Sequence, residues 1–392
     1  MKECVIVDGV RTANVRAHPK KGWFRNLRPE VPLKAAYTAL FARNPQVNPE
    51  NIDAVFCGTA NQAGMQNDIA RLGWLAGGFP ESIPTNGIGQ QCPSGMAAAE
   101  HAARAIMCGE GEIYVVSGVE DMEKANPMFH IDFSPLLADR YNMQDLLMGS
   151  TAEKVAAQYS VSRVDQENFA FWSHRRAHEA TEAGKFANEI IPVEGHDDEG
   201  NTIIVDRDQW VRPDISMDQM AAMKPAYRED GVVTAATSSP ITAGACAMLL
   251  MSREKADELG MKYHLAYAGG VMAGCDPTVM GMGPLYAARK LLAWKGMTIN
   301  DIDVWELNEA FGSQSLAVLR ELGLGENAPF ENVNVWGGAL ALGHPLGQSG
   351  ARIIITLNNI MQNDYPDATY GVAMLCGGFG NANASLWKNV KK

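Results

Sequence analysis

Residues 86–106 read NGIGQQCPSGMAAAEHAARAI and decide the fold. Cys92 stands directly before a helix made largely of alanine, and a helix that is apolar on nearly every side is usually buried on both faces. A second such helix is expected over residues 349–361, which include the run Ile353, Ile354 and Ile355. We therefore predict two α/β halves whose sheets enclose one helix from each half. This arrangement brings the starts of the two helices together, and with them Cys92 and the region of His344.

The order of the other segments supports a duplicated fold. Short β-rich runs alternate with helical ones, which is typical of α/β proteins. Equivalent motifs recur at a spacing of roughly 250 to 256 positions, as for Asp53 with Asp303 and Tyr114 with Tyr370. We expect strands over residues 4–8, 52–57, 113–117, 302–307 and 370–375, and helices over residues 68–75 and 313–322.

The composition excludes several classes of function. The chain has 392 residues, 46% of them hydrophobic, which is enough for two ordinary domains. The net charge is −12, and the basic residues form no dense run, so neither nucleic acid nor anionic lipid is an expected partner. No stretch approaches the length that spans a bilayer. Seven scattered cysteines form neither a disulfide framework nor a zinc spacing, and no apolar leader is present, which predicts a cytoplasmic protein.

Residues 120–240 differ in sequence pattern from the segments on either side and resemble an insertion between the halves. An amphipathic helix is expected over residues 162–184, and the acidic turn at residues 196–200 is expected to close a solvated hairpin. His174 and His178 stand at helical spacing, but no further ligand is spaced to complete a site. We therefore expect both histidines on a surface face and assign no metal. The segment also holds the methionines Met122, Met128, Met143 and Met148.

Reactive side chains stand beside glycines at three places. Cys92 precedes a helix, whose unpaired N–H groups are expected to lower the pKa of the thiol toward neutrality. His344 lies in GGALALGHPLGQSGAR at residues 337–352, and Cys376 lies in LCGGFGNANA at residues 375–384. A thiol, an imidazole and a second thiol indicate a two-cysteine covalent catalyst. The alternative is that all three are packing residues and that Asn308 only caps a helix starting at Glu309.

Ordered motifs along the chain carry a family resemblance: CPSGM (92–96), SGVEDM (117–122), MGSTAEKVA (148–156), NEIIPV (188–193), ATSSPITAGA (236–245), CDPTVMGMGP (275–284), ELNEAF (306–311), GGALALGHPLGQSGAR (337–352) and CGGFG (376–380). On these motifs the chain resembles the thiolases, most closely the degradative 3-ketoacyl-CoA thiolases of bacterial fatty acid β-oxidation. The resemblance implies a five-layered αβαβα fold. It divides the chain into an N-terminal half at residues 1–119, completed by 241–268, a loop domain over the CoA channel at 120–240, and a C-terminal half at 269–392.

The resemblance also implies a role for each candidate catalytic residue. Cys92 attacks the 3-keto carbon after losing its proton to His344, and the C2–C3 bond then breaks. His344 and a water held by Asn308 form the first oxyanion hole, and Cys376 supplies a proton to the departing carbon and later activates CoA. The backbone N–H groups of Cys92 and Gly378 receive the second oxyanion.

The resemblance implies substrate contacts and partners as well. Arg212 is expected against the nucleotide of CoA, Ser239 near the pantetheine amide, and Met148 and Phe311 along the substrate. Coenzyme A is a co-substrate, and no permanent cofactor is expected. The expected assembly is a homodimer or homotetramer, with a hydratase/dehydrogenase subunit of a β-oxidation complex as a possible partner.

Several residues depart from the usual thiolase pattern, namely Pro93, Ala243, Trp336 and the turn that contains Phe379. Trp336 and Phe379 are large and are expected to shape the acyl pocket. Leu147 stands where acetoacetyl-specific thiolases often have histidine, which favours a longer or broader acyl substrate. Three alternatives stay open: an acetoacetyl-CoA thiolase working in the biosynthetic direction, a non-catalytic CoA-binding scaffold subunit, and a decarboxylating condensing enzyme of the ketoacyl synthase type.

Overall fold

The strands of the first half form one side of a large sheet. The structure, a computed structural model, describes residues 1–126 and 133–391. β3 (Ala54–Gly58) is parallel to β4 (Thr85–Ile88) and β5 (Ile113–Asp121), whereas β9 (Thr242–Ser252) is antiparallel to both β5 and β1 (Cys4–Thr12). β9 and β5 are buried along their whole length, as expected for strands covered by helices on both faces. In spatial order these strands are β4, β3, β5, β9 and β1.

The second half repeats this topology. β11 (Val304–Leu307) runs parallel to β12 (Tyr370–Gly377), and β13 (Asn381–Asn389) and β10 (Leu265–Gly274) follow in antiparallel order. The place of β4 is taken by a single parallel bridge between Trp305 and Val333. The order β3-β5-β9-β1 therefore matches β11-β12-β13-β10, and the predicted duplication is confirmed.

The two halves meet through their first strands. β1 pairs with β10 where Val5 lies opposite Ala266, so the two predicted sheets are joined into one continuous sheet. The short strands β2 (Val15–Arg16) and β6 (Ile190–Ile191) pair with β9 and β1. The structure therefore has one sheet where two were predicted, because β1 and its equivalent in the other half, β10, pair with each other.

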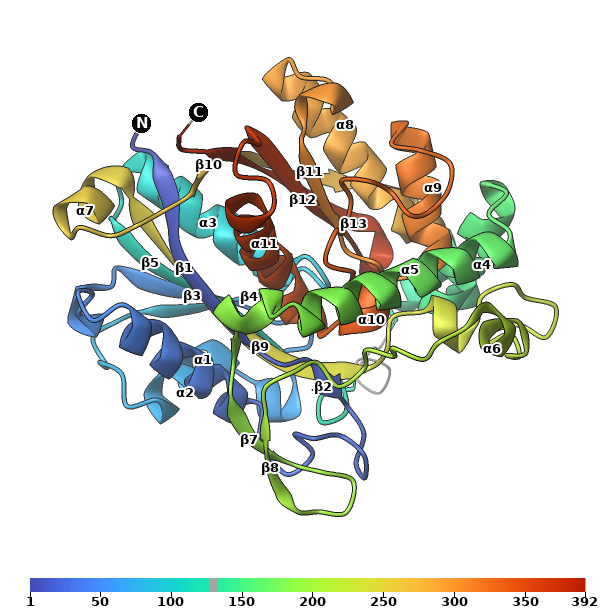
Figure 1. The fold of residues 1–392 in the computed structure, drawn as a ribbon, viewed down its shortest axis with the longest axis horizontal. Helices are drawn as coiled ribbons and strands as arrows, with labels where there is room; N and C mark the ends of the chain where they lie inside the picture. The colour runs from blue at the N-terminus through green and yellow to red at the C-terminus, as the bar shows by residue number, and fades with distance from the viewer. Residues whose placement is uncertain (127–132, 392) are drawn as a thin grey trace.

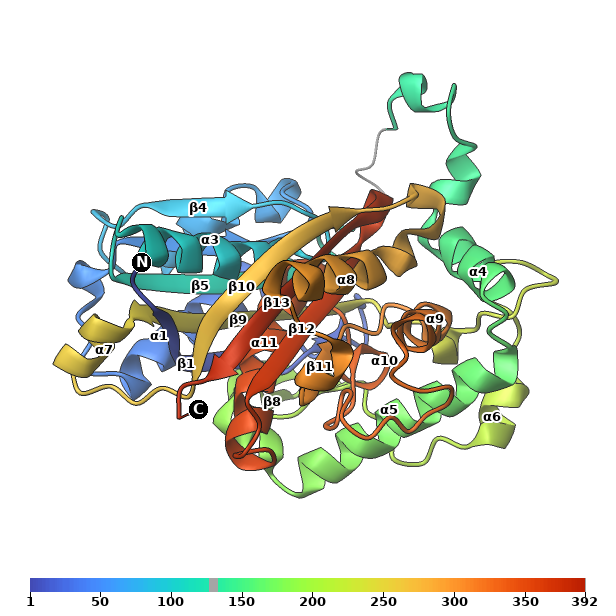
Figure 2. The ribbon, with the colours of Figure 1, turned by 90° about the horizontal axis from the view of Figure 1, so that it is seen from above.

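Helices cover the sheet in three layers (Figure 1). α1 (Glu30–Arg43) and α2 (Ile69–Ala76) pack on the outer face of the first half, where Trp74 and Leu33 are buried. α3 (Ser94–Cys108) and α11 (Leu346–Asn363) lie between the halves. α8 (Gly283–Lys295) and α9 (Gly312–Leu322) cover the outer face of the second half, as Figure 2 shows for α8. The layers thus follow the order αβαβα, as predicted.

Glycines allow the two central helices to touch at their starts. A Cβ added to Gly350 would lie 2.4 Å from the Met96 amide nitrogen, and one added to Gly95 would lie 2.7 Å from the Gly347 carbonyl oxygen. Such distances exclude any larger residue without movement of the backbone. The prediction that the helix starts meet is confirmed.

The expected insertion forms a layer of its own along one side of the molecule (Figure 1). α5 (Arg163–Glu182) matches the predicted helix and begins with a capping box between Ser162 and Asp165. The acidic turn closes a hairpin, as predicted, between β7 (Val193–His196) and β8 (Thr202–Val205). α4 (Met148–Gln158) and α6 (Met217–Ala221) also belong to this segment, whereas α7 (Arg253–Glu258) and α10 (Ala339–Leu342) lie outside it. Met128 lies outside the described residues, and the three-part division of the chain stays a prediction.

The expectation of two surface histidines on α5 is wrong for His174. Its side chain is buried, and its Nδ1 accepts a hydrogen bond from the Arg212 backbone N–H at 3.1 Å. Burial, and then the positive charge of Arg212, lower the pKa of His174 to about 4. Helical spacing predicted a shared face, but the packing of the insertion turned that face inward at this residue.

Within residues 1–126 and 133–391, no helix is long and apolar enough to cross a bilayer. The seven cysteines all lie in these residues and are all free thiols. No group of three or more histidine, cysteine or acidic side chains in the described part of the chain is arranged to hold a metal ion.

Candidate active site

One cavity of about 270 Å³ collects most of the predicted site residues. It opens where the starts of the two central helices meet the insertion and the turn between β12 and β13. Among the predicted residues, the cavity is lined by Cys92, His344, Gly378, Ser239, Met148 and Phe311. Phe379, expected to shape the acyl pocket, also lines it, and the remaining lining residues are Gln91, Met122, Asn126, Tyr227, Ile241, Met280, Ala310 and Leu346.

Cys92 lies at the entrance to α3 with 7% of its surface exposed. The backbone N–H groups of Gly378 and of Cys92 itself donate to its sulfur and favour the thiolate, but burial outweighs them and raises the pKa of Cys92 to about 12. The nearby charge of Glu120 acts in the same direction as burial. The predicted pKa near neutrality is therefore wrong for the resting protein, because the loss of hydration disfavours the thiolate more than the two N–H donors favour it.

His344 is held in one tautomer by its neighbours. Its Nδ1 lies 2.6 Å from Ser349 Oγ, and the Ser349 hydroxyl donates to the Pro345 carbonyl oxygen at 3.0 Å. Because that hydroxyl proton is already used, Ser349 Oγ accepts the proton of Nδ1, which leaves Nε2 with a free lone pair. Asn308 Nδ2 approaches Nε2 at 3.4 Å. Burial, and then the charge of Arg352, lower the pKa of His344 to about 3, so the imidazole is neutral and Nε2 is a base.

Cys376 lies beneath the cavity rather than in its wall. It is the second-last residue of β12, is fully buried, and packs with Met280, Ala310 and Phe311, which do line the cavity. Burial raises the pKa of Cys376 well above its ordinary value, and the neighbouring Cys92 thiol raises it further. The second thiol is therefore protonated and close enough to the first to interact with it.

Asn308 follows β11 and does not cap a helix. Its backbone N–H donates to the Met374 carbonyl oxygen at 3.0 Å, and α9 begins only at Gly312. Its side-chain Oδ1 is buried without a hydrogen-bond partner among the described residues. The capping alternative is thus wrong, and the amide is directed at His344 instead.

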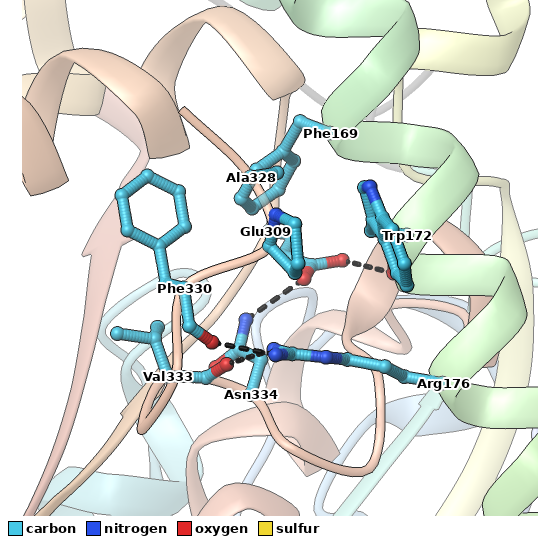
Figure 3. Close-up of a pocket in the computed structure, with 10 residues that line it drawn as sticks. Phe169, Trp172, Arg176, Glu309, Ala328, Phe330, Val333 and Asn334 are labelled. Atoms are coloured by element: carbon cyan, nitrogen blue, oxygen red, sulfur yellow. Dashed lines mark hydrogen bonds between the residues drawn. The ribbon is translucent and has the colours of Figure 1, made fainter. Parts of the chain in front are cut away.

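Glu309, which sequence reasoning passed over, fixes the turn that carries Asn308. Its carboxylate accepts hydrogen bonds from Ser173 Oγ at 2.6 Å, Asn334 Nδ2 at 2.8 Å and the Leu340 backbone N–H at 3.1 Å. Figure 3 shows the bond from Asn334 to Glu309 beside a hollow of about 20 Å³, where Arg176 donates to the carbonyl oxygens of Val333 and Phe330. The signal that could have found it is a second acidic residue in the motif ELNEAF, directly after a strand expected to be buried, since a buried carboxylate needs partners.

Arg212 lies outside the cavity. Its guanidinium stacks on Trp210, with the carbon of the group 4.7 Å from the ring centroid, and Arg16 approaches the same indole at 4.6 Å. Two cations around one aromatic ring form a half-buried positive feature. The structure does not bring it to Cys92.

Three of the four departures from the thiolase pattern, Pro93, Ala243 and Trp336, do not line the cavity. Trp336 is buried in the central core, where its Nε1 donates to Asp364 Oδ2 at 2.6 Å and its ring meets Phe186. Ala243 is buried in β9 opposite Val15. The expectation that Trp336 shapes the acyl pocket is corrected, because its side chain packs behind the loop that Gly337 begins. Phe379 does line the cavity, with a left-handed φ of 65°.

Known families account for nearly the whole chain. Residues 4–254 match the N-terminal domain of thiolase, and residues 262–389 match its C-terminal domain. The chain belongs to the thiolase family. It is 43% identical to a 3-ketoacyl-CoA thiolase of Marinomonas sp. (strain MWYL1) over 99% of this chain and 98% of that relative. It is 44% identical to the 3-ketoacyl-CoA thiolase of Shewanella sp. (strain MR-7) over the full length of both.

Solved thiolase structures have the same fold. The acetyl-CoA acetyltransferase of Bacillus anthracis superposes with a TM-score of 0.88 at 33% identity, covering 100% of this chain and 99% of that one. The dimeric peroxisomal thiolase of Saccharomyces cerevisiae gives 0.88 at 31% identity, covering 99% and 97%. The duplicated halves and the central helix pair of this thiolase are therefore a family architecture.

Proposed function

We propose that this thiolase cleaves 3-ketoacyl-CoA with CoA, giving a shortened acyl-CoA and acetyl-CoA through an acyl group carried on Cys92. One observation carries the proposal: Cys92 and His344 line the same cavity, and the hydrogen bonds of Ser349 leave His344 Nε2 without a proton, so it can accept one. The relatives named 3-ketoacyl-CoA thiolase support the same reaction.

In the first half-reaction, the proton of Cys92 moves to His344 Nε2 as the sulfur bonds to C3 of the substrate. The C2–C3 bond then breaks, and its electron pair leaves with the acetyl-CoA enolate. The enolate carbon takes the proton of Cys376, which becomes a thiolate. Asn308 and His344, whose side chains meet at 3.4 Å, would stabilise the charge on the substrate oxygen during these steps.

In the second half-reaction, the Cys376 thiolate takes the proton of the CoA thiol. The CoA sulfur attacks the acyl thioester, and the N–H groups of Cys92 and Gly378 bind the oxyanion. When the intermediate collapses, the Cys92 sulfur leaves and recovers its proton from His344. Both thiols and the imidazole return to their starting states.

The resting pKa values favour proton transfer only during the reaction. With a thiol pKa of about 12 and an imidazole pKa of about 3, the ion pair of Cys92 and His344 is unfavourable before substrate arrives. Bond formation to C3 removes the charge from sulfur as it develops. Transfer is therefore coupled to attack, and the unliganded thiol is protected from adventitious chemistry.

The cavity lining supports a broad acyl specificity. Met122, Met148 and Met280 all line it, and methionine is unbranched and adapts to ligands of different shape. Phe311 meets Tyr227 edge to face across the same cavity. We propose that these residues accept acyl chains longer than acetyl, and the alternative of a dedicated biosynthetic acetoacetyl-CoA thiolase is not favoured.

The outer parts of CoA are proposed to follow a path from Ser239 to Arg212. Ser239 lies in the cavity wall, and the half-buried cation of Arg212 suits a phosphate. A homodimer, the state of the dimeric yeast peroxisomal thiolase, or a homotetramer stays a prediction for this chain, as do a β-oxidation partner and a cytoplasmic location. Sedimentation of the purified protein measures the first of these.

The catalytic proposal is tested by the mass of the protein after mixing with acetyl-CoA. Wild-type protein should gain one acetyl group at Cys92, and Cys92→Ser should gain none. Cys376→Ala should still be acylated but should turn over very slowly, because the proton for C2 and the base for CoA are both lost. Full turnover by either variant contradicts these roles. Consumption of malonyl thioester without thiolysis would instead indicate a decarboxylating condensing enzyme.

A further inference from the structure

Glu120 is a buried carboxylate that the catalytic proposal does not use. It lies near the end of β5 with 1% of its surface exposed, and it does not line the catalytic cavity. It belongs to the motif SGVEDM. Among the residues that the structure describes, its carboxylate accepts hydrogen bonds from N–H groups of two separate segments of the chain.

The two oxygens of Glu120 link the loop after β3 to the start of α11. Oε2 accepts from the Ala60 backbone N–H at 2.8 Å and from the Gly347 backbone N–H at 2.9 Å. Oε1 accepts from the Asn61 backbone N–H at 3.3 Å and from the Gln66 side chain. The carboxylate therefore joins segments that lie far apart in the sequence, and it does so beside Cys92, whose pKa its charge raises.

Gly347 is the point at which this contact reaches the active site. It lies in the first turn of α11, where backbone N–H groups have no partner within the helix. Burial raises the pKa of Glu120 to about 7, and the N–H donors, led by Gln66, oppose that shift. In its ionised form the carboxylate also stabilises the dipole of α11. The same first turn holds Ser349, which fixes the His344 tautomer, and the turn begins directly after the segment His344–Pro345.

The duplication places Glu120 opposite a catalytic residue. The spacing of roughly 256 positions that relates Tyr114 to Tyr370 also relates Glu120 to Cys376. The spacing of roughly 255 that relates Ser94 to Ser349 relates Cys92 to Gly347. The contact between Glu120 and Gly347 spans the two halves and is thus the equivalent, under the duplication, of the pair of Cys376 and Cys92, which also spans them.

We propose that Glu120 is a positioning residue for catalysis, which holds the first turn of α11 through Gly347 and so sets where His344 Nε2 faces Cys92. This inference rests on the proposed role of His344 as base. One equivalent position of the duplicated fold performs chemistry, and the other fixes the geometry of that chemistry.

The test is a double-mutant cycle on the rate of Cys92 acylation. Glu120→Gln keeps the volume but turns an NH2 group toward N–H donors, so it should slow acylation about 10- to 100-fold with KM changed less than about threefold. In a His344→Asn background the same change should have an effect below about twofold, because the base it positions is already gone. Equal slowing in both backgrounds would overturn the proposal.

Two further measurements separate positioning from other roles. Glu167→Gln is the matched control, since Glu167 is a buried carboxylate paired with Arg163 and does not line the cavity, and its acylation rate should be unchanged. If Glu120→Gln does not fold, Glu120→Asp keeps the charge, withdraws it from Gly347 and should also slow acylation at least about fivefold.

Alkylation of Cys92 by iodoacetamide distinguishes the electrostatic alternative. If Glu120 acted only through its charge, removing that charge would ease ionisation of Cys92 and make alkylation faster than in the wild type, which would overturn positioning. Slower alkylation supports it. If the His344→Asn single variant acylated Cys92 at the wild-type rate, the proposed function would be refuted. That result differs from the results that would overturn only the role of Glu120.

Discussion

At the residue scale, the environment of each side chain decides its chemistry more than its type does. Cys92, Cys376 and Cys57 are all buried thiols whose pKa burial raises, yet only the first lies in the cavity beside a neutral imidazole. The groups around each thiol and around the imidazole account for this difference in reactivity. Two backbone N–H groups face the Cys92 sulfur, and Ser349 fixes which nitrogen of His344 is basic.

Ser349→Ala should slow acylation of Cys92 by about tenfold with little loss of stability. Without the hydroxyl acceptor, the Nδ1 proton has no fixed partner and the imidazole spends time in the tautomer that places the proton on Nε2. Rapid-quench measurement of acetyl-Cys92 gives the rate. Ser349→Thr keeps a hydroxyl and should recover part of the rate; an unchanged rate in the alanine variant would show that Ser349 does not set the tautomer.

At the element scale, the contact between α3 and α11 is what assembles the site. The two helices touch through glycines at their first turns, and Cys92 and His344 stand immediately before those turns. Close approach of backbones therefore sets the separation of nucleophile and base. The contact is possible only because neither glycine carries a Cβ.

Gly350→Ala should lower the free energy of unfolding by about 1–3 kcal/mol and reduce the acylation rate. The new methyl group would lie 2.4 Å from the Met96 nitrogen, so α3 and α11 must separate. Urea denaturation gives the stability. Gly274→Ala is the control because an added Cβ there meets nothing within 4 Å, and it should change neither quantity. Equal effects of the two substitutions would contradict a tight helix contact at Gly350.

At the scale of the whole molecule, the hydrophobic cores between the layers of the fold enclose many titratable groups. Burial raises the pKa of the thiols of Cys4, Cys57, Cys92, Cys246 and Cys376. The buried Tyr37 hydroxyl, which contacts Ser117 Oγ at 2.8 Å, is shifted in the same direction, again by burial. These groups ionise in the unfolded chain at a lower pH than in the folded protein.

The free energy of unfolding should therefore fall as pH rises above about 8.5. A thiol whose pKa is higher in the folded state stabilises the fold fully below its unfolded pKa, and that contribution is lost at about 1.4 kcal/mol per pH unit above it. Thermal unfolding between pH 8.5 and 10.5, in reductant, measures the slope. Cys57→Ala removes one such group, so its slope should be smaller; identical slopes would mean that the Cys57 thiol does not resist ionisation.

The sequence by itself determined the layered α/β fold, the duplication, the buried central helices and the thiolase residues. These features could be predicted because periodicity and runs of small residues depend only on neighbouring positions, and the order of motifs is written in the sequence itself. It also led to two errors of the same kind: a lowered Cys92 pKa and a solvent-facing His174, where the outcome depends on burial by distant segments.

Only the tertiary structure decided which neighbours each side chain has. It placed Trp336 in the core, joined the halves through Val5 and Ala266, and brought Glu120 to Gly347. Helical and strand patterns fix which face of an element is apolar, whereas packing between elements fixes solvation and hydrogen bonding. Those two quantities set the pKa of Cys92 and the tautomer of His344, and so they decide where the base meets the nucleophile.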